Sequence, residues 1–194
     1  MNILVEELPE AVQIGESVYP IVTDFRAALR VYLAFEDDDL AAREKIMILL
    51  ANLYPETPDD IEGAIMQGLK FLNCGEEAKN ETDAPRLYSF TKDASLIFAA
   101  FHQTHGIDLE TAEMHWWKFW ALFMDLGADT AFCNLVSLRK RVNEGTATKE
   151  ERRAVQKMGA AFDVPQHHSP EEKAAAAEFW RADAERQRRE REGQ

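Results

Sequence analysis

Three histidines near the middle of the chain are the residues whose type and spacing come nearest to a chemical site. His102 and His105 lie three positions apart near the end of a predicted helix, and His115 follows on the next helix. Imidazole nitrogens this close in sequence suit zinc. However, the chain has no H-E-x-x-H arrangement and no evident supporting acid. We therefore rank a His-dependent metal site below a simpler interpretation, in which these are helix-end and surface histidines.

Other catalytic patterns are missing from the sequence. It contains no Gly-rich phosphate loop and no G-x-S-x-G elbow, and His167–His168 lies in a Pro-flanked stretch. Cys74 and Cys133 show neither metal-ligand spacing nor a nucleophile signature, so we interpret them as small apolar side chains of a reduced protein. The carboxylates concentrate at predicted helix starts, where capping explains them. We predict a non-enzymatic protein with no catalytic residue, no cofactor and no metal.

Composition narrows the classes of partner. The chain has 194 residues, 46% of them hydrophobic, which is enough for a sizeable core. Its formal net charge of −13 argues against binding to nucleic acid, which requires clustered Lys and Arg. No signal peptide and no run of about 20 apolar residues is evident, so we expect a soluble, intracellular protein without a membrane partner.

We expect the rest of the chain to be organised around the stretch Asp108–Gly127, which contains His115. It predicts a helix with Asp108 as N-cap and Gly127 as stop. An apolar face this broad is typical of a helix with neighbours on several sides, so we predict a central core helix. The residues at helical spacing on that face are Trp116, Phe119, Trp120, Phe123 and Leu126, and Lys118 and Asp125 form the polar stripe.

Four apolar residues are candidates for binding a partner instead of packing in the core. Trp117 and Met124 widen one edge of the core face, so either of them, if exposed, would mark a protein-binding patch. Phe179 and Trp180 are the large apolar residues of a last helix that is otherwise rich in Ala, Glu and Arg. Such a segment has little to bury, so we expect it to project or fray unless a partner covers it.

The remaining chain predicts a mainly α fold. About eight helices follow a short N-terminal β-hairpin around Gly15-Glu16, where a leading Gly suits a type II′ turn. The helices are predicted from Thr23 or Asp24 to the acidic run at 36–39, and over 40–53, 58–72, 91–104, 108–127, 130–141, 149–162 and 171–191. Thr91 or Ser89 is expected to cap the helix that Gly106 ends, and Thr148 is expected to open a capping box. We divide the chain into a hairpin element at 1–22, a helical core domain at 23–163 with a mobile linker at about 75–86, and a projecting, charged C-terminal helix at 164–194.

Two charge runs have ordinary explanations at helix ends. The acidic run Glu36–Asp39 is expected to complement the dipole at the start of the next helix. Arg139–Arg141 is expected to do the same at the end of a helix. Neither run requires a ligand.

One part of the chain resembles the gene-product-fifteen family of tailed bacteriophages that infect Gram-positive hosts. The most specific string is His115-Trp116-Trp117-Lys118-Phe119, which follows Gly106-Ile107-Asp108-Leu109. The other matching residues are Tyr88, Ser89, Phe90, Asp93, Ile97–Phe101, Phe132, Arg139 and Thr148–Arg153. The resemblance covers mainly the stretch from Tyr88 to Arg153, and the N-terminal half matches in length and helical character.

The resemblance implies a tail assembly chaperone. Members of this family are encoded in the tail module, near the major tail protein and the tape measure protein. The implied partners are the tape measure protein and the tail tube protein, in the host cytoplasm, with the chaperone absent from the virion and no catalytic or metal residue to carry over. Homo-oligomerisation is compatible with coating a long partner, although no heptad seam supports it. The alternatives are a structural tail completion or connector protein and, less favoured, a metalloprotein using His102, His105 and His115.

Overall fold

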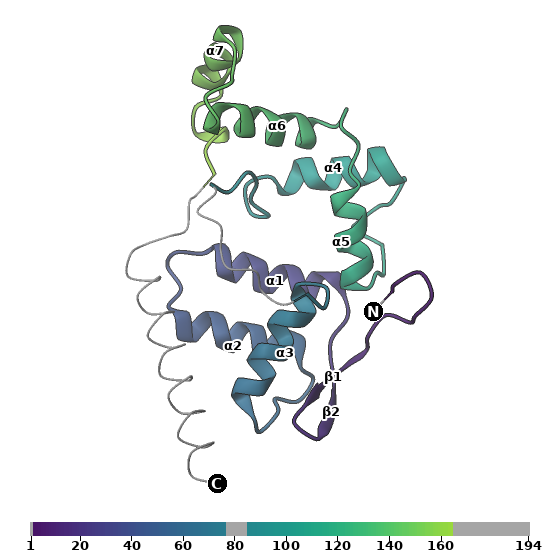
Figure 1. The fold of residues 1–194 in the computed structure, drawn as a ribbon. Helices are drawn as coiled ribbons and strands as arrows, with labels where there is room; N and C mark the ends of the chain where they lie inside the picture. The colour runs from purple at the N-terminus through teal and green to yellow at the C-terminus, as the bar shows by residue number, and fades with distance from the viewer. Residues whose placement is uncertain (1, 77–84, 165–194) are drawn as a thin grey trace.

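The structure is a computed structural model that describes residues 2–76 and 85–164 (Figure 1). It confirms a mainly helical fold with a short N-terminal hairpin. The elements are β1 (Ala11–Ile14), β2 (Ser17–Pro20), α1 (Phe25–Glu36), α2 (Ala42–Leu53), α3 (Ile61–Leu72), α4 (Ala94–His105), α5 (Trp116–Met124), α6 (Ala131–Asn143), α7 (Lys149–Met158) and a 3-10 turn at Gly159–Ala161. The predicted C-terminal helix and most of the predicted linker lie outside the described residues.

The hairpin forms where the sequence predicts it. Ile14 pairs with Ser17, which leaves Gly15-Glu16 as a two-residue loop. Gly15 takes a φ of +58°, as the first loop residue of a type II′ turn requires. Ile14 is buried and joins the hydrophobic core, and β1 packs against α3. The hairpin is therefore attached to the helical core through Ile14 and the contact of β1 with α3.

The helices form two groups joined by α5. Helices α1 and α2 lie side by side, and α3 packs against α2 and the hairpin (Figure 1). On the other side, α4 packs against α6, while α7 stands at the far end of the molecule (Figure 1). Helix α5 contacts both α1 and α4. This position agrees with the central role predicted for it.

Phe119 is the centre of an aromatic column. Its ring stacks on Phe25 at a centroid distance of 4.9 Å and on Phe101 at 4.8 Å, with interplanar angles of 7° and 14°. Trp116 and Phe123 stack against it from the same helix. Each such pair contributes about 0.5–1.5 kcal/mol beyond area burial. The column ties α1, α4 and α5 into one core.

The predicted start of the central helix is wrong by two turns. Helix α5 begins at Trp116, and His115 is its N-cap. The preceding backbone is extended because it pairs with the start of α1: Trp116 N donates to Thr23 O at 2.6 Å, and Phe25 N donates to Met114 O at 3.0 Å. Asp108 instead closes a local turn by accepting the Glu110 N–H. A contact between distant parts of the chain thus overrides a local capping signal.

Two other helix starts also lie later than predicted. Helix α3 begins at Ile61 instead of Pro58, because the Asp60 carboxylate accepts the Gly63 N–H at 3.0 Å and so serves as the N-cap. Helix α4 begins at Ala94, one turn after Ser89, whose hydroxyl caps a preceding turn. Its end is as predicted, with Gly106 in the left-handed conformation at φ +67°.

Glu36 corrects the interpretation of the acidic run. It belongs to the end of α1, and its side chain is 5% exposed. Its carboxylate accepts hydrogen bonds from Ser89 Oγ, the Phe90 N–H and the Thr91 N–H, and pairs with Arg86. These bonds and the Arg86 charge lower the pKa of Glu36 below its ordinary value, although burial acts in the opposite direction.

Arg139 corrects the interpretation of the basic run. Its side chain is 2% exposed and forms a bidentate pair with Asp93, at 2.6 and 3.0 Å. The guanidinium also donates to Phe162 O at 2.8 Å and to Leu87 O at 3.1 Å. A buried guanidinium requires such a full set of acceptors. Arg139 therefore joins α6 to the turn before α4 and to the residues after α7.

Candidate partner-binding surface

His115 fixes the start of α5. Its Nδ1 accepts the Trp117 N–H at 3.0 Å, which places the ring proton on Nε2, 3.0 Å from Pro9 O. The imidazole therefore caps the helix at one nitrogen and holds the N-terminal segment at the other. A specific contact of this kind explains why a histidine, which is an uncommon N-cap, stands at the start of this helix.

The two adjacent tryptophans attach α5 to the end of α3. Trp116 Nε1 donates to Leu72 O at 2.9 Å, and Trp117 Nε1 donates to Phe71 O at 2.8 Å. The last carbonyls of a helix need partners from outside it, and these indoles supply two. Trp117 is only 7% exposed. The expectation that Trp117 faces a partner therefore does not fit its burial, and we assign it to the core.

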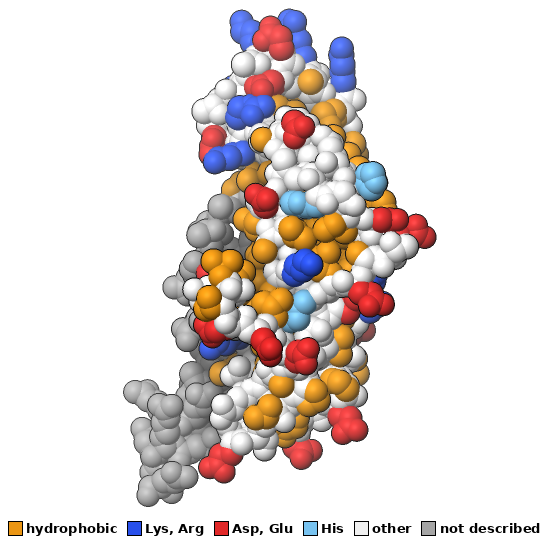
Figure 2. Space-filling model, turned by 90° about the vertical axis from the view of Figure 1, so that its right-hand side faces the viewer, with side chains coloured by type: hydrophobic (Ala, Val, Ile, Leu, Met, Phe, Trp, Pro, Cys, Tyr) orange, Lys and Arg blue, Asp and Glu red, His pale blue; other side chains and the backbone are white. Residues whose placement is uncertain are grey.

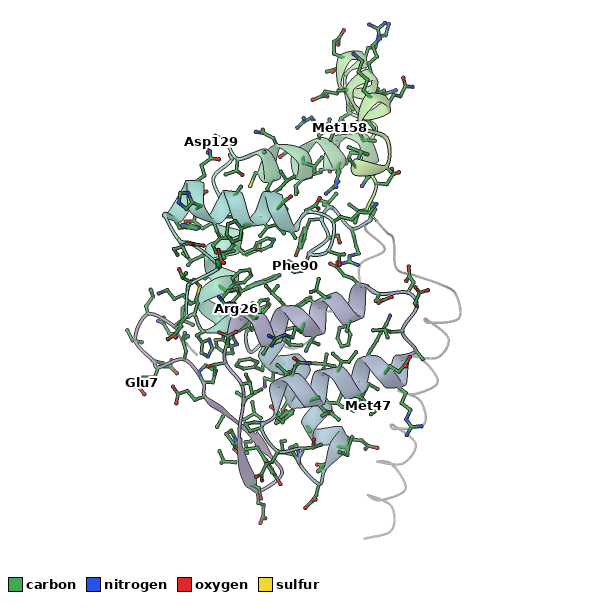
Figure 3. The ribbon with its side chains drawn as sticks, turned by 180° about the vertical axis from the view of Figure 1, so that it is seen from behind. Glu7, Arg26, Met47, Phe90, Asp129 and Met158 are labelled. Carbon is green, nitrogen blue, oxygen red and sulfur yellow. The ribbon has the colours of Figure 1, made fainter. Side chains whose placement is uncertain are left out.

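Arg26 holds the turn that precedes α5. Its guanidinium donates to the carbonyls of Leu109, Glu110 and Ala112 at 2.8–3.0 Å (Figure 3). Three carbonyl acceptors for one guanidinium fix the path of this turn beside α1. The start of α5 is thus held by the His115 cap, by the two tryptophan indoles and by the turn that Arg26 binds. These contacts fix the position of its outer surface.

The three histidines considered for zinc have separate surroundings. His105 Nε2 donates to Leu122 O at 2.9 Å, His102 is exposed on α4, and His115 caps α5. Within residues 2–76 and 85–164, no group of three or more His, Cys, Asp or Glu side chains is arranged to hold a metal ion. His105 and His115 instead hold backbone groups in place, His105 at Leu122 O and His115 at the start of α5.

An apolar surface remains on the outside of α5. We call it the α5 face, and its apolar residues are Ala121, Leu122 and Met124, which lie beside the exposed charges of Lys118 and Asp125. Met124 is 68% exposed and so stays a candidate for binding a partner, and Leu122 is half-buried. Figure 2 shows hydrophobic side chains gathered over α5 in the middle of this face, around a basic side chain and between acidic margins.

An N-terminal turn also exposes apolar side chains. Ile3, Leu4 and Val5 are 52%, 87% and 80% exposed. The turn is closed by hydrogen bonds from the Val5 and Glu6 N–H groups to Asn2 O, which leaves the three apolar side chains pointing outward. Three consecutive exposed apolar residues are unusual outside a binding surface. Sequence reasoning missed them, although an apolar triplet next to two acids is a readable signal.

Among the described residues, methionine is the large hydrophobic residue type most often exposed. Met47, Met66, Met124 and Met158 are 59%, 46%, 68% and 39% exposed, whereas Met114 is buried. The flexible, polarisable thioether side chain adapts to partners of varied shape. Met47 on α2 and Met158 at the end of α7 lie far apart (Figure 3). Among the exposed methionines, Met124 is the one that belongs to the α5 face.

Partial or full burial raises the pKa of two titratable side chains, Cys74 and Tyr54, to about 12. Both side chains are thus protonated at neutral pH, which disfavours a role as nucleophile. Cys74 and Cys133 are free thiols, each half-buried.

Two further observations bear on the predicted partners. Phe179 and Trp180, the other candidate binding residues, lie outside the described residues. Among the helices of the described residues, none is both long and apolar enough to span a bilayer.

Comparison with known proteins gives one match. The model of the family described as Bacteriophage Gp15 protein matches residues 4–164. The match includes the α5 face and most of the N-terminal turn. No curated protein and no solved structure matches the chain.

Proposed function

Because the chain belongs to the Bacteriophage Gp15 protein family, we propose that it is a tail assembly chaperone that binds the tape measure protein. The family match is the single observation that carries this proposal, and it supports a structural, tail-related phage protein rather than an enzyme. In the proposed role, the protein acts in the host cytoplasm, keeps the tape measure protein soluble and assists assembly of tail tube subunits around it.

The α5 face supports the proposal with a suitable contact surface. Amphipathic helices bind apolar grooves and patches through side chains at spacings of three and four residues. Met124 and the N-terminal turn together expose large apolar side chains on the scaffold that Trp116 and Trp117 make rigid. Full burial of one such side chain contributes about 1.5–3 kcal/mol. A few of these contacts suffice for a complex that must later dissociate.

Co-expression with the tape measure protein of the same phage tests the proposal. We expect more soluble tape measure protein and a complex that survives purification. An unchanged soluble fraction, with no complex isolated at any ratio, would overturn the proposal.

The family match also allows a structural component of the virion, such as a tail completion or connector protein. Mass spectrometry of purified particles separates the two functions. Stoichiometric recovery of the chain in mature virions favours the structural role, whereas its absence from particles that contain the tape measure protein favours the chaperone.

A further inference from the structure

The charges of the chain are segregated along the molecule. The stretch 139–158 holds seven of the 22 Lys and Arg residues against three Glu. Residues 1–76, which form the hairpin and α1–α3, hold fifteen Asp and Glu against five Lys and Arg. Helix α7 stands at one end of the molecule, and the hairpin with the start of α3 stands at the other (Figure 1). Basic side chains crowd the α7 end in Figure 2, whereas acidic side chains predominate below it.

Helix α7 has no core of its own. None of its ten residues is buried. It is held at its ends: Thr148 and Glu151 form a capping box, the Glu151 carboxylate pairs with Arg141, and Lys92 donates to Ala160 O and Asp163 O just after the helix. A helix this short is marginal in water without packing. Within the part of the chain that the structure describes, the surface of α7 is exposed and can contact another molecule.

One face of α7 carries a stripe of like charge. Lys149, Arg153 and Lys157 are exposed and lie four residues apart, so they follow one side of the helix. Like charges at this spacing cost an isolated helix about 0.2–0.5 kcal/mol for each pair. An acidic surface laid against the stripe removes that cost. Met158, 39% exposed, adds an apolar contact at the end of the helix.

The opposite end of the molecule has a hollow of complementary character. Its volume is about 480 Å³, and its lining is Tyr19, Pro20, Pro55, Glu56, Thr57, Pro58 and Asp59. The Tyr19 ring and the exposed Pro20 and Pro55 offer an apolar floor to side-chain stems, whereas Pro58 is buried beneath them. Glu56 and Asp59 are exposed carboxylates at the same place. A helix that carries Lys, Arg and Met is the kind of ligand this surface fits.

We propose that α7 of one copy of this chain docks into the hairpin-end hollow of a second copy. The basic stripe Lys149, Arg153 and Lys157 faces Glu56 and Asp59, and Met158 with the Lys and Arg stems packs on Tyr19, Pro20 and Pro55. The two surfaces differ and lie at opposite ends, so the contact is heterologous and joins copies head to tail into rings or short chains. The proposal does not depend on the function proposed above.

Charge reversal tests this contact without any phage partner. One variant carries Lys149→Glu, Arg153→Glu and Lys157→Glu, and a second carries Glu56→Lys and Asp59→Lys. All five side chains are exposed, and circular dichroism confirms that each variant folds. Sedimentation velocity at low salt should show self-association of the native chain that high salt weakens, and at least tenfold weaker association of each variant alone.

The mixture of the two variants is the decisive sample. In it each α7 finds a hollow of opposite charge on the other variant, so association should be restored through alternating copies. The control variant Glu110→Lys with Glu113→Lys makes the same two acid-to-lysine changes on an exposed turn away from the hollow and should associate like the native chain. A native chain that stays monomeric at low salt, or reversals without effect, or a mixture that stays monomeric, would overturn the proposal.

Discussion

Ser89 Oγ donates a hydrogen bond of 2.6 Å to Glu36 Oε2, across 53 positions of sequence. The bond joins the end of α1 to the turn that leads into α4. Four residues further, Asp93 accepts the Ser89 N–H and pairs with Arg139 of α6. The two groups of helices are thus held together by a continuous polar network as well as by the aromatic column. Phe90 lies within this junction (Figure 3).

Replacing Glu36 by Gln should lower the free energy of unfolding by about 2–4 kcal/mol. Each carboxylate oxygen accepts a backbone N–H, Oε1 from Phe90 at 2.9 Å and Oε2 from Thr91 at 3.1 Å. A Gln amide must therefore place its NH₂ group against one of these donors in either orientation. Urea titration measures the loss. Asp37→Asn removes the same charge at an exposed neighbour and should change stability by less than about 0.5 kcal/mol.

The contribution of Glu36 should depend on pH in one direction. Its folded pKa is lowered, so its stabilisation is complete above the unfolded carboxyl range, about pH 4, and is lost as the pH falls through the folded pKa. The difference in unfolding free energy between the native chain and Glu36→Gln should shrink on acidification. Chemical denaturation at a series of pH values measures it, and a difference that grows toward acid would contradict the assignment.

Arg139→Met should destabilise the chain by about 3–5 kcal/mol, because it leaves the Asp93 charge buried and unpaired. Lys140→Met next to it removes a charge whose side chain is 62% exposed and should have little effect. Adding Asp93→Asn to Arg139→Met removes the unpaired charge. The double variant should therefore be more stable than Arg139→Met in thermal unfolding. Equal or lower stability of the double variant would speak against a buried ion pair.

Gly75→Ala should destabilise more than Gly145→Ala, by about 1 kcal/mol. Both glycines have positive φ, +83° and +73°, so both substitutions impose similar backbone strain. At Gly75 the new methyl carbon would meet the Trp117 ring at 3.0 Å, whereas at Gly145 no atom lies within 4 Å. The difference between the two variants in chemical denaturation isolates the contact with Trp117. Equal losses would mean that Trp117 gives way easily.

Local signals in the sequence predicted much of the fold. Asp24 and Thr148 cap α1 and α7 through their own side chains, and Gly106 ends α4. Each of these depends on residues within four positions, so a short stretch of sequence contains the whole interaction. The apolar spacing around Phe119 likewise identified the central helix.

Interactions between distant residues account for what was missed. His115 caps α5 only because the backbone beside it pairs with Thr23 and Phe25. Glu36 and Arg139 look like surface charges until the turn at 86–93 folds between them. Trp117 looked like an edge residue because its acceptor, Phe71 O, belongs to another helix. The exposed N-terminal turn was missed because its apolar triplet has no periodicity.

Binding of the tape measure protein to a Met124→Glu variant tests the central claim most directly. Met124 and Met47 are both exposed on helices, at 68% and 59%, so Met47→Glu on α2 is the matched control. Both variants should fold with native stability. The proposed function at the α5 face predicts at least tenfold weaker binding for Met124→Glu, measured by titration calorimetry, and native binding for Met47→Glu. Native affinity of Met124→Glu, or no binding by the native chain, would contradict it.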